Sequence, residues 1–245
     1  MAVIDEFTLI SGAPFFIDGV CHLVPPTLAK IRDETLSTYQ SYVGLLLLQK
    51  NEVCELLTCD TKDVESLNLL QLVTMIPEFR CAYLSALGFF ISEGITYDEE
   101  IGYTTGDGSK SISLELLWRI RSGILQLCCV PENEKAPPLK FRNAKAKERY
   151  ERMQMLRERN AKRRRAMPPN ADMALPNLIS AVAAYSSTYN LLNIWGLTLY
   201  QFYDQFARLN GKNELDVIGL RWAAWGKDEF DFSLWHKAMT PSNKS

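Results

Sequence analysis

The chain contains 245 residues, of which 47% are hydrophobic and 23% are charged, and its formal net charge is −2. These values are ordinary for a globular protein and allow one or two domains with modest cores. The apolar run Val43–Leu48 is far shorter than the roughly 20 residues that cross a bilayer, and Asp5 and Glu6 are unlike the basic start of a secretion signal. We therefore expect a cytoplasmic protein without a membrane segment.

The charge is unevenly distributed along the chain. Residues 140–165 contain twelve Lys or Arg and three Glu, a net charge of +9, whereas residues 1–139 carry −10 and residues 166–245 carry −1. This segregation predicts a mainly α fold in three parts. They are an acidic α+β domain with a small hairpin or sheet (1–130), a basic helical linker (131–170) and a small, aromatic-rich, all-α domain (171–245).

The first elements of the N-terminal domain are predicted to be short strands over 7–10, 15–17 and 20–24. The last two strands are joined by the turn signal Asp18-Gly19. From Leu28 to Leu47, apolar residues recur mostly at intervals of three and four after the capping residue Thr27. This pattern predicts one amphipathic helix of about 20 residues.

The rest of this domain is predicted to be mostly helical. Helices are expected over 51–58, over 63–76 before Pro77, and over 79–91. The segment 94–111 contains four glycines between β-formers, which predicts a hairpin with its tip at 106–109. Ser113 is expected to cap a final helix that reaches Cys128.

The linker and the C-terminal domain are predicted to be helical. Residues 141–167 contain no Gly or Pro but few apolar residues, which is typical of a solvated helix that folds partly or only on a partner. In the C-terminal domain we expect three helices. The first runs from Pro176 to Leu192, the second from Leu199 to the C-cap signal Asn210-Gly211, and the third begins after the capping residue Asn213.

No pattern in the chain is typical of a catalytic, cofactor or metal site. The six cysteines lack the CxxC spacing of zinc sites, and the two histidines, His22 and His236, are far apart. Gly106–Lys110 does not have the spacing of a phosphate loop, and the acidic cluster Asp98–Glu100 is typical of a solvated loop. We therefore predict structural cysteines and a non-enzymatic protein that uses no cofactor and no metal.

The basic residues Arg163, Arg164 and Arg165 allow two functional interpretations. They can bind nucleic-acid phosphates, with an affinity that depends on salt, or contact an acidic helix of a protein partner. The acidic remainder of the chain would repel a polyanion, and no aromatic residues suited to base stacking alternate with the basic ones. Protein contact or a plain linker is therefore favoured, with nucleic-acid association as the alternative.

The tryptophans Trp222, Trp225 and Trp235, together with Phe230 and Phe232, lie in one short C-terminal stretch. They are more aromatic residues than a domain of this size must bury. Because Trp and Tyr dominate interface hot spots, we predict a partner-binding surface there, with core packing as the alternative.

Longer patterns resemble a known family. Phe16-Ile17-Asp18-Gly19, Pro26–Ile31 and Tyr39–Tyr42 before a leucine run, and Leu199–Asn210 before a Trp-rich tail, are similar to sequences from tail-assembly modules of long-tailed bacteriophages of Gram-positive hosts. The family is that of the phage tail assembly chaperones. The resemblance covers residues 15–48 and 176–239.

The resemblance implies a function. In such chaperones the N-terminal domain coats the tape-measure protein and keeps its long apolar helix soluble. A C-terminal extension then recruits tail-tube subunits and departs as the tube polymerises. We therefore expect a chaperone in the cytoplasm of the infected host cell, with the tape-measure and tail-tube proteins as partners and homo-oligomerisation left open. A structural component of the finished tail is the remaining alternative.

Overall fold

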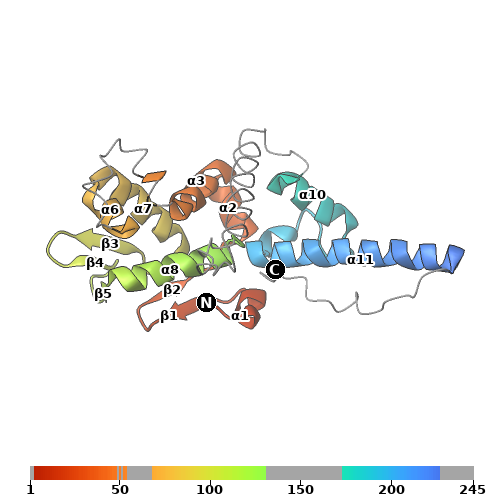
Figure 1. Ribbon diagram of the computed structural model, residues 1–245, viewed down its shortest axis with the longest axis horizontal. Helices are drawn as coiled ribbons and strands as arrows, with labels where there is room; N and C mark the ends of the chain where they lie inside the picture. Colours follow the sequence, from red (N-terminus) through yellow and green to blue (C-terminus); the bar gives the residue numbers. More distant parts are fainter. Residues whose placement is uncertain (1–2, 49, 51, 54–67, 131–172, 227–245) are drawn as a thin grey trace, which may run out of the picture. The chain divides into compact units, whose positions relative to one another are not determined.

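The computed structural model describes residues 3–48, 50, 52–53, 68–130 and 173–226 (Figure 1). The described residues are mainly α-helical with short antiparallel strands, which confirms the predicted fold class. The chain divides into two compact units, one formed by residues 1–132 together with 192–245 and the other by residues 133–191. This division differs from the three segments expected from the sequence. The basic linker 140–165 lies outside the described residues.

The first element of the larger unit is a helix, α1 (Glu6–Ser11), where a strand was expected. The Asp5 carboxylate caps it by accepting a hydrogen bond from the Thr8 N–H at 2.9 Å. The helix ends at Gly12, which adopts the left-handed conformation with φ 70°. The strand prediction over 7–10 was wrong because four residues are too few to show whether the hydrophobic period is that of a strand or of a helix. The capping residues at both ends favour the helix.

The predicted hairpin is confirmed. β1 (Phe15–Ile17) pairs antiparallel with β2 (Cys21–Leu23). Asp18 and Gly19 have φ values of 47° and 71°, and the N–H of Val20 donates to the Ile17 carbonyl at 2.9 Å. Two positive φ values in succession are what the tightest hairpin turns require, and Asp-Gly tolerates them.

Two helices replace the single long one predicted from Leu28 to Leu47. They are α2 (Leu28–Glu34) and α3 (Leu36–Leu47). Thr35 separates them with φ 83° and ψ 143°, and its hydroxyl caps α3 by accepting the Thr38 N–H. A β-branched residue rarely takes a positive φ, so the apolar period continues across a break that no local signal announces.

Three further helices contribute much of the core of this unit. α6 (Leu69–Met75) begins with a capping box between Asn68 and Gln71, and α7 (Pro77–Phe90) begins at a proline. α8 (Leu114–Leu127) is capped by Ser113, as predicted. α7 packs against α3 and α6, and α8 packs against α3, α6 and β2. The largest fully buried side chains include Tyr83, Phe90, Leu117, Ile120 and Ile124.

A three-stranded antiparallel sheet lies between α7 and α8 in the chain. β3 (Ile95–Asp98), β4 (Gly102–Thr105) and β5 (Ser111–Ile112) pair in that order. The predicted hairpin is thus present, and β5 extends it. Residues 106–109 form the turn between β4 and β5. The Asp98 carboxylate accepts the N–H groups of Glu100 and Ile101, so it shapes the turn between β3 and β4.

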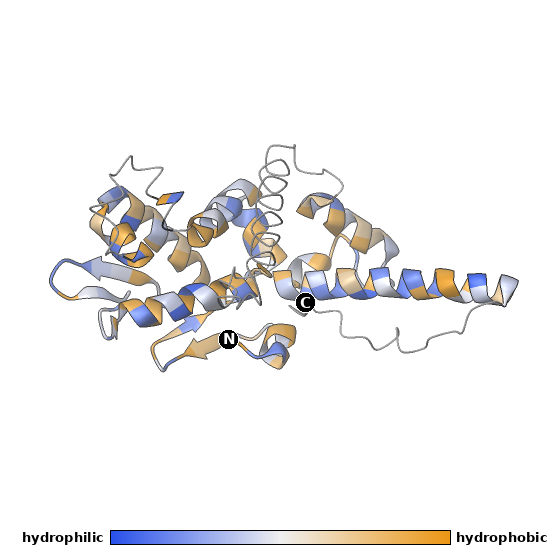
Figure 2. Ribbon diagram, viewed as in Figure 1, coloured by the Kyte–Doolittle hydropathy of each residue, from blue (hydrophilic) through white to orange (hydrophobic). Residues whose placement is uncertain are grey.

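In the smaller unit, the structure describes α10 (Leu175–Tyr185), which has Pro176 in its first turn and ends before the predicted Leu192. The larger unit resumes with a short 3-10 helix, η2 (Ile194–Gly196), and then α11 (Leu199–Trp225). Figure 2 shows hydrophilic and hydrophobic residues alternating along α11. None of the helices in the described ranges is both long and apolar enough to cross a membrane.

The predicted helix end at Asn210-Gly211 and the separate third helix were wrong, because α11 continues through both residues. Gly211 does not have a positive φ, whereas Gly226, the real C-cap, has φ 55°. A glycine inside a helix costs only about 1 kcal/mol relative to alanine, which the surrounding helix formers outweigh.

Candidate protein-interaction site

α11 carries two apolar stripes. In each of them the residues are spaced by three, four and three positions, which keeps them on one face of a helix at about 100° per residue. The spacing breaks between Leu209 and Leu215, and this break turns the second stripe by about 160° from the first. The first stripe is Leu199, Phe202, Phe206 and Leu209, and the second is Leu215, Ile218, Trp222 and Trp225.

The first stripe attaches α11 to the N-terminal residues of the same unit. Leu199 and Phe202 are fully buried, as is Ile194 of η2. The N–H of Leu28 donates to the Leu197 carbonyl, and the N–H of Leu199 donates to the Pro26 carbonyl, both at 2.9 Å. These two bonds form an antiparallel bridge that joins two distant parts of the chain.

Side chains extend this attachment on both sides of the bridge. The Gln201 amide donates to the Ile10 carbonyl at 2.9 Å, and a Cβ placed on Gly12 would come within 2.9 Å of the same amide nitrogen. The guanidinium of Arg32 lies 5.3 Å from the ring centre of Trp195. Each of these contacts forms only when the start of α11 lies close to the N-terminal residues, so α11 is held in a defined position from its first turn.

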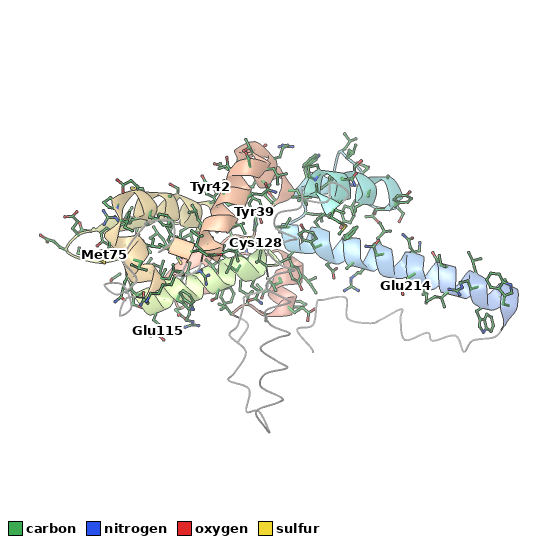
Figure 3. The ribbon with its side chains drawn as sticks, turned by 45° about the horizontal axis from the view of Figure 1, so that its top comes forward. Tyr39, Tyr42, Met75, Glu115, Cys128 and Glu214 are labelled. Atoms are coloured by element: carbon green, nitrogen blue, oxygen red, sulfur yellow. The ribbon has the colours of Figure 1, made fainter. Side chains whose placement is uncertain are left out.

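Tyrosine and cysteine side chains fill the remaining space near the start of α11. Burial raises the pKa of Tyr200 to about 12, with a smaller contribution from nearby Glu6 and Cys129. Burial also raises the pKa of Cys128 to about 12, although a hydrogen bond with Tyr39 opposes the shift. Figure 3 shows Tyr39 and Cys128 close together. At neutral pH the side chains of Tyr200 and Cys128 are therefore uncharged and act as packing residues, which is the structural role predicted for the cysteines.

The second stripe has a different environment. Trp222 is 49% exposed and Trp225 is 67% exposed, whereas Leu215 and Ile218 are half-buried. Val217 and Leu220 are also exposed, but at about 100° per residue they lie on the other side of the helix, in line with the first stripe. Large apolar side chains that are exposed together on one face, as Trp222 and Trp225 are, mark sites of protein contact. Their three-four spacing is the one with which a helix docks into an apolar groove or onto another helix.

The structure thus brings two of the predicted site residues together. Trp222 and Trp225 lie one turn apart on one face of α11. The other predicted residues, Arg163, Arg164, Arg165 and Trp235, lie outside the described residues. Val217 and Leu220 were expected only as residues of a separate third helix and not as site residues.

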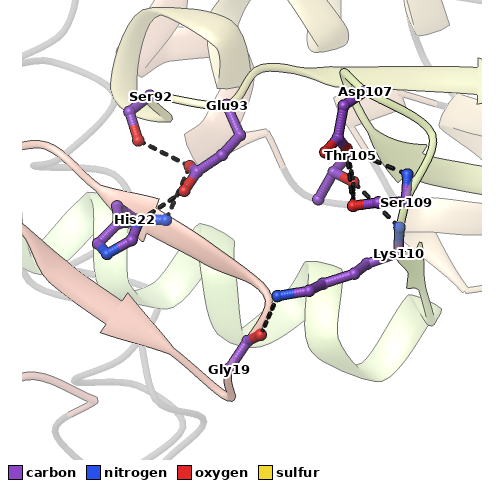
Figure 4. Close-up of polar contacts among 8 residues, drawn as sticks. All are labelled: Gly19, His22, Ser92, Glu93, Thr105, Asp107, Ser109 and Lys110. Atoms are coloured by element: carbon purple, nitrogen blue, oxygen red, sulfur yellow. Dashed lines mark hydrogen bonds and ion pairs between the residues drawn. The ribbon is translucent and has the colours of Figure 1, made fainter.

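A polar cluster in the larger unit is another group of close side chains (Figure 4). The Glu93 carboxylate accepts hydrogen bonds from the His22 N–H at 2.9 Å and the Ser92 hydroxyl at 2.7 Å, and it contacts the His22 ring Nδ1 at 2.5 Å. Burial raises the pKa of Glu93, but these hydrogen bonds outweigh it and lower the pKa to about 2. The Lys110 ammonium donates to the Gly19 carbonyl at 2.6 Å.

This cluster ties the β1–β2 hairpin to the neighbouring segments. A carboxylate held ionised by three donors is a poor general base, because its pKa lies far below neutral pH. No group of three or more His, Cys, Asp or Glu that could hold a metal ion occurs in the part of the chain that the structure describes. The exposed end of α11 is therefore the better candidate for a functional surface.

Comparison with known proteins bears on this surface. Residues 162–240, about a third of the chain, match the family model of the YomV second domain. YomV is a protein of a Bacillus phage region. No curated protein and no solved structure matches the chain significantly. The matched segment includes Arg163–Arg165, α10, α11 and all three predicted tryptophans, so the part of the chain that carries the candidate surface resembles a phage-associated domain.

Proposed function

We propose that this protein is a non-enzymatic chaperone of phage tail assembly. In this proposal, residues 1–130 bind the tape-measure protein, and residues 176–239 bind tail-tube subunits and deliver them to it. The similarity of residues 162–240 to a phage-associated domain supports the phage context. The specific clients come from the resemblance of residues 15–48 and 176–239 to tail assembly chaperones.

The observation that carries the proposal is the exposure of Trp222 and Trp225 on a helix whose beginning is firmly docked. Ordering two tryptophans on a regular helix before binding removes part of the entropy cost of association. Truncation of such aromatic anchors typically costs 2 kcal/mol or more of binding energy. A surface of this kind is suited to holding another polypeptide.

The proposed delivery depends on the two stripes of α11 serving different contacts. The first stripe is used inside the larger unit, through Leu199 and Phe202. The proposal assigns the second stripe, in which Trp222 is 49% and Trp225 is 67% exposed, to contact with a tube subunit. A chaperone that holds one client on its N-terminal residues and another at the end of α11 raises the local concentration of each near the other.

The test is co-expression of the full chain with the tape-measure and tail-tube proteins of the same phage region, followed by purification through a tag on this chain. We expect both proteins to co-purify. Double substitution of Trp222 and Trp225 by alanine should weaken retention of the tube protein by about 30-fold or more, as for loss of one strong hot spot, and leave the tape-measure protein bound. Trp118→Ala is the control for retention of the tube protein, since Trp118 is an exposed tryptophan on α8, outside residues 176–239.

Two results would contradict the proposal. If neither protein co-purifies with the full chain, the chaperone function is wrong. If the chain is instead found at stoichiometric amounts in purified, finished particles, it is a structural component of the tail, since a chaperone leaves before completion. A protein inventory of the particles by mass spectrometry separates these cases.

A further inference from the structure

Within the larger unit, the start of α11 docks on N-terminal residues of the chain. We call the docked segment, residues 194–206 with Ile194, Leu199 and Phe202, the plug. The socket is the set of N-terminal residues that receive it, namely Ile10, Gly12, Pro26–Leu28 and Arg32. We infer that the socket of one copy of this chain also accepts the plug of a second copy, which gives a dimer by reciprocal exchange. This inference is independent of the proposed function.

The plug is a self-contained binding element. Its three buried apolar residues are anchors, and its backbone at Leu197 and Leu199 is paired with the socket by two hydrogen bonds. The capping box of Thr198 and Gln201 fixes the start of the helix within the plug itself. All these contacts are specified by the sequences of the plug and the socket. A plug with the same sequence therefore meets the same partners, whichever copy supplies it.

The covalent path between socket and plug does not dictate which copy pairs with which. The two parts of the larger unit are joined by residues 133–191, which form a compact unit of their own. Plug and socket are therefore connected through a separate unit and not by a short loop, so the connection itself does not force them to pair within one chain.

Exchange of an identical element is a low-cost route to dimers, because the same contacts form in both states. The equilibrium between the monomer and the exchanged dimer is set by the effective concentration of the plug near its own socket, which falls as the connection lengthens. We therefore expect the exchanged dimer to increase with protein concentration. Each copy contributes one plug and one socket, so reciprocal exchange leaves neither of them empty.

Thr27 and Thr198 provide a direct test, because they face each other across the bridge. The flanking hydrogen bonds make them a non-hydrogen-bonded pair, for which the Cα separation is about 4.5 Å, within the range that a disulfide spans. One full-length chain carries Thr27→Cys and a first tag, and another carries Thr198→Cys and a second tag. The two are mixed at increasing concentration, equilibrated, and oxidised with oxidised glutathione.

The expected product is a covalent dimer that contains both tags, because only exchange places residue 198 of one chain beside residue 27 of the other. Its yield should rise with concentration and fall at least several-fold when the Thr198→Cys chain also carries Phe202→Ala. Each single variant oxidised alone is the control for exposed native thiols such as Cys81. A double variant, Thr27→Cys with Thr198→Cys, shows whether the pair can form a disulfide at all. If the double variant closes within one chain while the mixture gives no doubly tagged dimer, the inference is wrong.

Discussion

Gly123 of α8 lies directly against Leu23 of β2, and a Cβ at position 123 would come within 2.7 Å of the Leu23 Cδ1 atom. Both residues are buried, so the side chain of Leu23 has little room to move aside. The contact explains why a glycine occupies the middle of a core helix, where it is otherwise unfavourable.

Gly123→Ala should therefore destabilise the protein. The gain in helix propensity, about 1 kcal/mol, is outweighed by overpacking against Leu23, which typically costs about 1–3 kcal/mol. Gly44→Ala is the matched control, because Gly44 is inside α3 with open space around its Cβ position. We expect that variant to be more stable than wild type by up to about 1 kcal/mol. Urea unfolding followed by circular dichroism measures both, and equal effects of the two variants would contradict the interpretation.

The two stripes of α11 should differ in their effect on stability. Phe202→Ala removes a fully buried ring from the core and should lower the free energy of unfolding by about 3–5 kcal/mol. Trp225→Ala removes an exposed ring and should change it by less than about 0.5 kcal/mol. Thermal or urea unfolding of the full chain compares them. A large loss of stability in Trp225→Ala would mean that this tryptophan is a core residue.

Tyr83 carries a hydroxyl that is buried and has no hydrogen-bond partner among the described residues. Tyr83→Phe removes this unsatisfied group and should stabilise the protein by about 1 kcal/mol. The hydroxyl of Tyr103, by contrast, is 2.8 Å from the Thr74 hydroxyl, so Tyr103→Phe should destabilise by about 1 kcal/mol. The two midpoints of urea unfolding should thus shift in opposite directions.

Acid should weaken the link between the hairpin and the neighbouring segments. The pKa of Glu93 is lowered to about 2 in the folded protein, compared with 4.5 for an ordinary glutamate. The folded state therefore binds a proton less readily than the unfolded state, and the stabilisation is present above pH 4.5 and lost as the pH falls towards 2. Glu93→Gln should flatten stability over this range. Hydrogen bonds from Thr105 and Ser109 lower the pKa of Asp107 to about 2 as well, so Asp107→Asn should flatten stability over the same pH range. If stability depends on pH in both variants as it does in wild type, the two carboxylates are not the source of the acid sensitivity.

Replacement of Arg163, Arg164 and Arg165 by glutamine distinguishes the two interpretations of the basic segment. If the segment contacts protein, wild type and variant should bind duplex and single-stranded DNA equally weakly at low salt. If it binds nucleic acid, wild-type affinity should fall steeply with salt, and the triple variant should lose up to three units of that slope. Fluorescence anisotropy at several salt concentrations measures the difference.

The parts of the fold that the sequence predicted are those with a strong local signal. Asp18-Gly19 supports two positive φ values, and Ser113 supplies a cap, so the position of the hairpin turn and the start of α8 were predicted correctly. The errors arose where a local signal was absent or overruled. Thr35 takes a positive φ that its side chain disfavours, and Gly211 stays helical although its sequence context resembles a helix end.

The candidate site was only partly predictable for a related reason. The density of tryptophans near the C-terminus indicated a contact surface, and Trp222 and Trp225 are indeed exposed together. The sequence did not reveal that Leu197–Leu199 pairs with Pro26–Leu28, because a bridge between distant segments depends on backbone atoms that every residue has. The separation of α11 into a docked start and an exposed end follows from that pairing.

The continuity of α11 through Asn210 and Gly211 has a mechanical consequence. A helix of 27 residues measures about 40 Å, and it does not bend freely as a jointed pair of helices would. A load applied at Trp225 is transmitted along this lever to the bridge at Thr198, so a pull or a twist at the far end reaches the N-terminal residues without being absorbed by a hinge. A partner bound at Trp225 therefore also exerts a force on the residues that pair with the start of α11.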